Sequence, residues 1–144
     1  MLRTILAVLA GAVAFIVLVS LMDMLSLVFH PLPPGADQHD PVAMTAHVAT
    51  APVVSMLIVV LGWLLGTFLG SLAICLIDKQ RPIVGVAILA ALAEAAVIMN
   101  AMMLPHPLWM TVSGIVLIPV VAYFAAHITP GVILSRRHRT HRTV

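Results

Sequence analysis

The sequence has few charged residues and only one cysteine. Asp, Glu, Lys and Arg make up 8% of the 144 residues, whereas a soluble globular domain typically carries about 25%. The apolar fraction is 62%, and the mean hydropathy is +1.18. These values exclude water as the main solvent of the folded chain, and the length fits one domain. A single cysteine, Cys75, also excludes an internal disulfide.

The sequence also lacks the motifs of common catalytic sites. It has no Gly-rich phosphate loop, no nucleophile elbow and no helical His pair at the spacing of a metalloprotease. We therefore predict no catalytic residues and no cofactor. We expect that the protein is not an enzyme.

What the sequence does have is four long apolar segments. Each exceeds the roughly 20 residues that an α-helix needs to cross about 30 Å of hydrocarbon. The segments are continuously apolar, whereas the strands of a membrane β-barrel would alternate. Short connections make neighbouring spans antiparallel, so we predict an all-α membrane four-helix bundle with up-down-up-down topology. The predicted spans are residues 4–29, 52–77, 82–104 and 107–128.

The one long connection is predicted to hold a short interfacial helix. Asp40 fits a helix N-cap and Pro41 a first-turn proline, which together predict a helix over residues 41–49. This helix and the four spans form a predicted transmembrane domain of residues 1–134. Residues 135–144 form a basic tail, which we expect to contact anionic lipid headgroups rather than nucleic acid.

Lysine and arginine predict the orientation in the membrane. Arg3 precedes the first span, Lys79 and Arg81 connect the second to the third, and the remaining four arginines follow the fourth. The first and third loops contain no lysine or arginine, and their only acidic residues are Asp37 and Asp40. By the positive-inside rule, both termini are predicted to be cytoplasmic.

Two carboxylates and one amide lie within the predicted spans. Asp23 is in the first span, and Glu94 is near the middle of the third. A charged residue at the bilayer centre costs about 2.5–3.5 kcal/mol on insertion scales, so such residues usually face protein or water. One interpretation is a proton or cation site between the first and third spans. The other is that both acids are protonated and hydrogen-bond across the bundle, with Asn100 as a candidate partner.

Three glycines in the second span are predicted to pack against another helix. Gly62, Gly66 and Gly70 are spaced by four residues, which places them along one side of the helix. Without Cβ atoms, that side lets a neighbouring backbone approach closely. The partner is either the first span, which offers Ala7 and Gly11, or another subunit.

Histidines and methionines gather on the side predicted to face away from the cytoplasm. Imidazole with thioether suits Cu(I), and His with Asp suits Zn²⁺. No pair has a recognised metal-binding spacing, so we predict no metal site. The weak candidates are His30, His39, His47 and His106.

Several short motifs together resemble a group of small, uncharacterised four-span bacterial inner-membrane proteins. The resemblance covers most of the chain outside the basic tail. It implies the four-span fold, an acid at the position of Asp23 and a location in a bacterial inner (plasma) membrane. It implies no activity. The motifs are Pro33-Pro34-Gly35, Asp40-Pro41, Gly62-Trp63-x-x-Gly66-x-x-x-Gly70 and Pro105-His106-Pro107-Leu108-Trp109.

Two classes of function fit these observations. The leading hypothesis is a non-enzymatic accessory or scaffold protein that acts in the lipid bilayer through helix packing, as a homo-oligomer or within a larger membrane complex. The alternative is a small transporter or channel for protons or metal ions that uses Asp23 and Glu94. Neither hypothesis identifies a substrate or a partner.

Overall fold

The computed structural model of the chain describes residues 2–37 and 39–129. Within these ranges the chain forms only α-helices, and four of the five are long and apolar enough to cross a membrane. The predicted fold class is therefore confirmed. The predicted basic tail, residues 135–144, lies outside the described residues, as does the domain boundary before it. The helices are α1 (Leu2–Phe29), α2 (Pro41–Ala49), α3 (Val53–Ile77), α4 (Pro82–Met103) and α5 (Leu108–Ile128).

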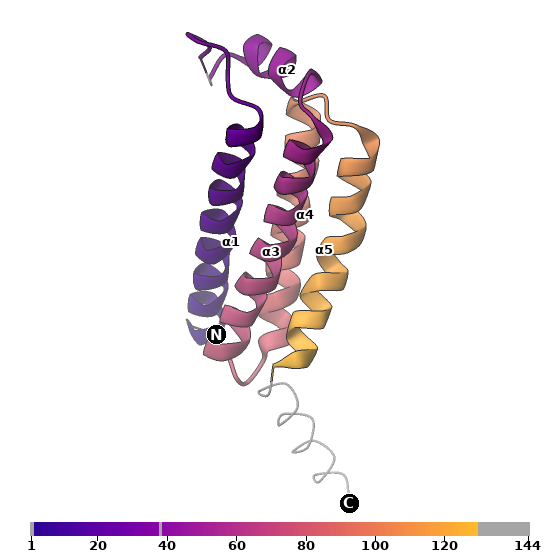
Figure 1. Cartoon of the computed structure of the whole chain (residues 1–144). Helices are drawn as coiled ribbons and strands as arrows, with labels where there is room; N and C mark the ends of the chain where they lie inside the picture. The colour runs from indigo at the N-terminus through magenta and orange to yellow at the C-terminus, as the bar shows by residue number, and fades with distance from the viewer. Residues whose placement is uncertain (1, 38, 130–144) are drawn as a thin grey trace, which may run out of the picture.

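The four long helices run up and down beside one another, and the short helix α2 covers one end of the bundle (Figure 1). We call this end the α2 end. The first turn of α1, the α3–α4 connection and the last turn of α5 lie at the opposite end (Figure 1). That end carries Arg3, Lys79 and Arg81, and we call it the basic end.

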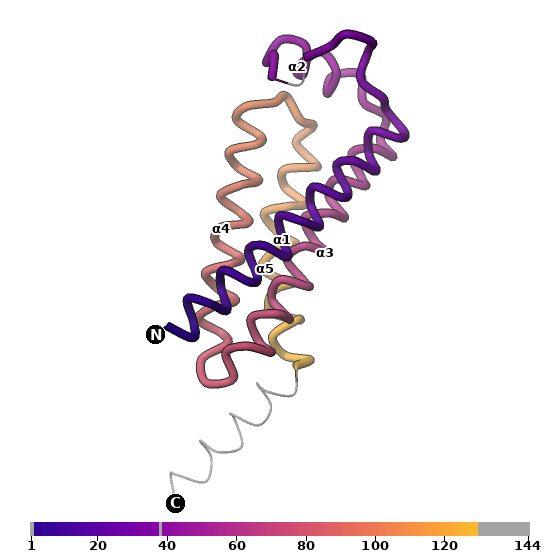
Figure 2. Tube along the Cα trace, turned by 90° about the vertical axis from the view of Figure 1, so that its left-hand side faces the viewer, coloured from indigo at the N-terminus to yellow at the C-terminus, as the bar shows by residue number. Residues whose placement is uncertain are grey.

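The bundle consists of two helix pairs that diverge toward the α2 end. Figure 2 shows α1 and α3 running side by side and inclined away from α4 and α5. Helix α1 packs mainly against α3 and much less against α4, whereas α3 also packs against α4 and α5. Helix α3 is therefore the centre of the bundle, and α1 lies at its edge.

Local signals in the sequence explain the first loop. The Pro33 carbonyl accepts a hydrogen bond from the Ala36 N–H at 3.0 Å, and Gly35 has a φ of 81°. This is a type II turn, which requires a positive φ at its third residue and therefore favours glycine there. Farther along, the Asp40 side chain accepts a hydrogen bond from the Val42 N–H at 2.9 Å. Helix α2 thus begins at Pro41 with the predicted cap.

Prolines also mark the ends of the later spans. Pro82 occupies the first turn of α4, as predicted. Pro107 instead precedes α5, with an extended backbone at ψ 141°, so this helix begins one residue later than predicted. The helix continues through Pro119 to Ile128.

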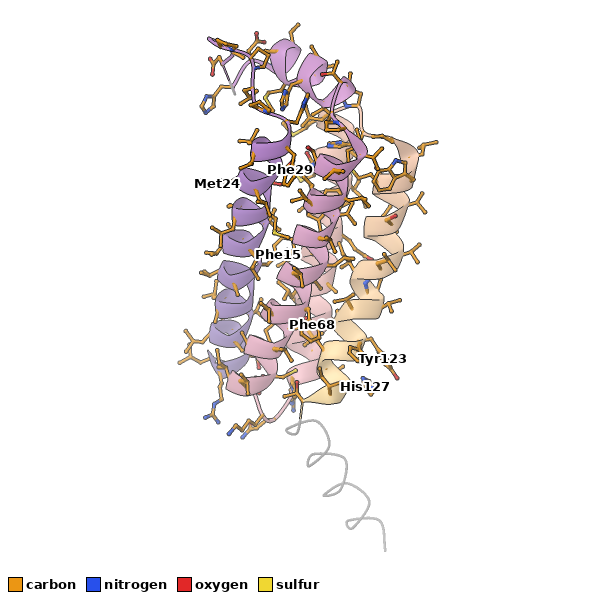
Figure 3. The ribbon with its side chains drawn as sticks, in the orientation of Figure 1. Phe15, Met24, Phe29, Phe68, Tyr123 and His127 are labelled. Carbon is orange, nitrogen blue, oxygen red and sulfur yellow. The ribbon has the colours of Figure 1, made fainter. Side chains whose placement is uncertain are left out.

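The helices pack around two clusters of buried apolar side chains and leave their outer faces apolar. Trp63 is 5% exposed and belongs to a core cluster with Val97 and Ile118. Phe15 of α1 packs against both core clusters, and Figure 3 shows it between α1 and α3. On the opposite side of α1, Met24 is 66% exposed (Figure 3). Such an apolar outer surface suits contact with lipid tails.

Candidate functional site

The three glycines of α3 form a groove that is occupied by α1. A Cβ atom built on Gly62 would lie 2.8 Å from the Cβ of Met22, and one on Gly66 would lie 3.0 Å from the ring of Phe15. At Gly70 the approach is between backbones, because a Cβ there would lie 2.7 Å from the carbonyl oxygen of Gly11. The groove is therefore used within the chain and is not open to another subunit.

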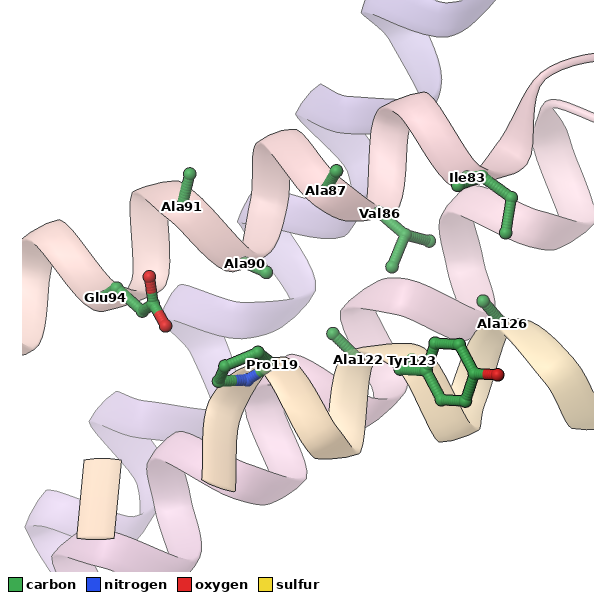
Figure 4. A pocket seen from close by; sticks show the side chains of 10 residues that line it. All are labelled: Ile83, Val86, Ala87, Ala90, Ala91, Glu94, Pro119, Ala122, Tyr123 and Ala126. Atoms are coloured by element: carbon green, nitrogen blue, oxygen red, sulfur yellow. The ribbon is translucent and has the colours of Figure 1, made fainter. Parts of the chain in front are cut away.

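A cleft between α4 and α5 contains Glu94. The cleft has a volume of about 340 Å³, and its α4 side includes three alanines, Ala87, Ala90 and Ala91. Figure 4 shows Glu94 at one end of the cleft across from Pro119 of α5, with Tyr123 toward the other end. Because alanine side chains are short, the two helices leave space between them here.

The carboxyl group of Glu94 has no partner in the part of the chain that the structure describes. It is half-buried, and among the described residues it makes no hydrogen bond or ion pair. No residue of α1 lines the cleft. An ionisable group at this depth normally faces a bundle interior, a water-filled cavity or a polar partner. Glu94 is therefore an ionisable group in a cleft that is left without a hydrogen-bond partner among the described residues.

Asp23 and Asn100 do not complete a site with Glu94. Asp23 lies on α1 and is exposed, and Asn100 lies in the last turns of α4 and is half-buried. In the part of the chain that the structure describes, neither side chain forms a hydrogen bond to Glu94 or to any other residue. The structure thus gives two separate carboxyl groups on two helices rather than a joined pair.

Three of the four candidate histidines gather at the α2 end. His30, His47 and His106 line a small cavity of about 80 Å³, together with Met56 and Met110. The rings of His30 and His47 are stacked, with centroids 4.1 Å apart, and His30 Nε2 donates to the carbonyl oxygen of His47 at 3.0 Å. His30 therefore ties the end of α1 to α2.

The environment keeps two of these imidazoles neutral at neutral pH. Burial lowers the pKa of His47, and the neighbouring His30 lowers it further by charge repulsion. Burial also lowers the pKa of His106, although a hydrogen bond from its Nδ1 to the Leu104 carbonyl oxygen opposes the shift. Neutral imidazoles can accept hydrogen bonds or bind metals.

The remaining candidate, His39, lies apart from this cavity. It is 95% exposed, and its Nδ1 lies 3.1 Å from a carboxylate oxygen of Asp37. An exposed pair of this kind contributes little to stability. Across residues 2–37 and 39–129, no three His, Cys, Asp or Glu side chains converge closely enough to hold a metal ion.

Sequence reasoning missed Asp78, which the structure places at the centre of the basic end. Its carboxylate is 2% exposed and accepts a hydrogen bond of 2.6 Å from the Thr4 hydroxyl. The N–H groups of Gln80 and Arg81 also donate to it, both at 3.1 Å. An Asp whose side chain can accept from N–H groups two and three residues later is a turn signal that was available in the sequence. Nothing in the sequence indicated that Thr4 would be the long-range partner of Asp78.

Aromatic residues mark the outer face of α5 near the basic end. The rings of Tyr123 and His127 are 3.8 Å apart, and Figure 3 shows both side chains on the same side of the helix. Tyr123 is 65% exposed, which suits a residue anchored at the membrane interface.

Comparison of the chain with family models, curated proteins and solved structures finds no match. The resemblance to small four-span bacterial membrane proteins therefore remains a prediction.

Proposed function

We propose that this membrane protein is a non-enzymatic subunit or scaffold of a larger membrane assembly, and that the α4–α5 cleft is its contact surface. The observation that carries the proposal is the unpartnered carboxyl group of Glu94 in that cleft. Leaving a polar group at mid-membrane depth without a partner is unfavourable, so an external donor would stabilise it. The alanine wall of the cleft would let another helix approach closely.

The chemistry of the cleft favours a particular kind of partner. It fits a transmembrane helix of another protein that presents a hydrogen-bond donor opposite Glu94, such as a hydroxyl, an amide or an ammonium group. Small or medium apolar side chains on that helix would fill the space along Ala87 and Ala91. The glycine groove of α3 does not compete for this role, because α1 already occupies it.

Site-specific cross-linking in native membranes tests this contact. With a photoreactive benzoylphenylalanine at Ala91, which lines the cleft, we expect a discrete protein adduct. The matched control is the next residue, Leu92, which is 53% exposed but does not line the cleft. A Glu94→Ala change should reduce the adduct about fivefold or more, because an interhelical hydrogen bond of about 1–2 kcal/mol is lost. Glu94→Gln should largely retain it.

The outcomes of this experiment separate the alternatives. Equal cross-linking from positions 91 and 92, or adducts with lipid alone, would contradict the proposal. An adduct of twice the 15.3 kDa chain mass would show that the partner is a second copy of this chain and not another protein. The transporter hypothesis has less support, because Asp23 and Glu94 are not joined to each other by any hydrogen bond in the described residues.

We also propose that the protein resides in a bacterial inner membrane with its basic end in the cytoplasm. The support is the placement of Arg3, Lys79 and Arg81 at one end of the bundle, with Asp37 and Asp40 in the loop at the other. Single cysteines introduced in a Cys75→Ser background test this orientation. An impermeant maleimide should label Asp37→Cys on intact cells and Gln80→Cys only after permeabilisation. The reverse pattern would contradict the proposed orientation.

A further inference from the structure

A pocket at the basic end brings together residues from the start of α1, the α3–α4 connection and the first turn of α4. Its volume is about 590 Å³, and Arg3 of α1 and Arg81 of the α3–α4 connection both line it. Both arginines are exposed. The pocket walls also include the apolar side chains of Ile5 and Val84, which are 56% and 51% exposed. The pocket therefore combines two cationic groups with an adjacent apolar surface.

The buried carboxylate of Asp78 holds this pocket in shape. Asp78 accepts hydrogen bonds from the Thr4 hydroxyl and from two backbone N–H groups of its own loop. The Thr4 contact joins residues that are 74 positions apart, and it fixes the first turn of α1 against the loop. Arg3 and Arg81 are consequently held beside the same space instead of being carried on independent segments.

The single carboxylate of Asp78 offsets only part of the positive charge of the two arginines. The Thr4 hydrogen bond is the main cause that lowers its pKa, with smaller contributions from the Arg81 and Gln80 N–H groups and from the charge of Arg3, while burial opposes the shift. The carboxylate is thus ionised at neutral pH and 2% exposed, with its oxygens engaged by three donors. Two guanidinium groups against this one carboxylate leave the mouth of the pocket positively charged.

We propose that this pocket binds the phosphate headgroup of an anionic phospholipid. Arg3 and Arg81 would contact the phosphate oxygens, because the guanidinium fork matches phosphate geometry and basic pockets between spans bind such headgroups. The acyl chains would run from the pocket along Ile5 and Val84. This site is separate from the α4–α5 cleft, so it does not depend on the proposed assembly role.

Native mass spectrometry of the full-length chain tests the proposal. The protein is released from detergent after incubation with equal concentrations of phosphatidylglycerol and phosphatidylcholine that carry the same acyl chains. We expect the wild-type protein to retain phosphatidylglycerol in preference to phosphatidylcholine. In an Arg3→Gln/Arg81→Gln variant that preference should fall about thirtyfold, because two basic residues near an anionic surface are lost.

Matched variants show whether the pocket or the general basic charge is responsible. Lys79→Gln removes one charge from the same loop but not from the pocket lining, so the preference should stay within about twofold of wild type. Arg3→Lys/Arg81→Lys keeps both charges but not the guanidinium fork and should give an intermediate preference. Thermal unfolding of each variant in phosphatidylcholine checks that the bundle remains folded.

Two results would overturn the proposal. One is an unchanged preference in the folded Arg3→Gln/Arg81→Gln variant. The other is displacement of phosphatidylglycerol by an equal concentration of inorganic phosphate, which would assign the pocket to a free phosphate ion rather than to a lipid.

Discussion

Replacing Gly70 by valine is expected to lower the free energy of unfolding by about 2–3 kcal/mol, because overpacking a close helix contact has costs of this size. The nearest atom to a new Cβ would be the Gly11 carbonyl oxygen, at 2.7 Å. That atom belongs to the backbone and cannot rotate away, so α1 would have to move off α3. Unfolding by SDS titration in mixed micelles, followed by circular dichroism, measures the change.

The control for Gly70→Val introduces a valine at an exposed position. Ala96 is exposed on α4, so Ala96→Val should change the unfolding free energy by less than about 0.5 kcal/mol. A reciprocal substitution strengthens the test. Gly11→Val should destabilise as strongly as Gly70→Val, because a Cβ on Gly11 would lie 2.8 Å from the Gly70 carbonyl oxygen. Equal stability of Gly70→Val and Ala96→Val would show that α1 and α3 do not approach closely here.

Truncating Trp63 to alanine is expected to destabilise the bundle by about 3–5 kcal/mol, the usual cost of removing a large aromatic side chain from a packed core. The indole is 5% exposed and lies against Gly114 of α5, where a Cβ would be 3.2 Å from the ring. It therefore fills the space between α3 and α5. The cavity that remains would lie within the core cluster that includes Val97 and Ile118.

The second tryptophan provides the matched control. Trp109 is 38% exposed near the start of α5, so Trp109→Ala should cost less than about 1 kcal/mol. The same SDS titration compares the two variants, and the remaining tryptophan reports unfolding by fluorescence in each. If both substitutions destabilised the protein equally, the role of Trp63 as a core residue would be contradicted.

The membrane spans could be predicted from the sequence because one physical rule dominates them. Backbone polar groups in hydrocarbon must be satisfied within the segment, so a long apolar run forms a helix. The starts of α2 and α4 could also be predicted, because Asp40 and Pro82 act within one turn of their own positions. Pro107 was placed one residue too far inside its helix because an N-cap and a first-turn proline have the same sequence context.

The candidate site could be predicted only in part, because its features depend on which helix faces lie together. The spacing of Gly62, Gly66 and Gly70 indicated a packing face but left the occupant open between the first span and another subunit. Glu94 was recognisable as an acid within a span, but the cleft beside Pro119 depends on which faces of α4 and α5 lie opposite each other. Apolar periodicity gives no such information when all sides of a helix are apolar.

Long-range polar contacts were the least accessible from sequence. The Asp78–Thr4 hydrogen bond joins a loop to a helix start 74 residues away, and many other hydroxyls could have served as the donor. The meeting of His30, His47 and His106 at one cavity likewise requires the first loop to fold back over the bundle. Their spacing along the chain gives no indication of this convergence.

The dominance of the α1–α3 contact has a consequence for biosynthesis. The chain up to Ile77 contains both partners, so this hairpin can assemble in the membrane while the later spans are still being translated. At about 5–20 residues per second, Ile128 follows roughly 3–10 s afterwards. The second pair then joins a preformed template, and the Thr4–Asp78 bond becomes available as soon as the α3–α4 loop is synthesised.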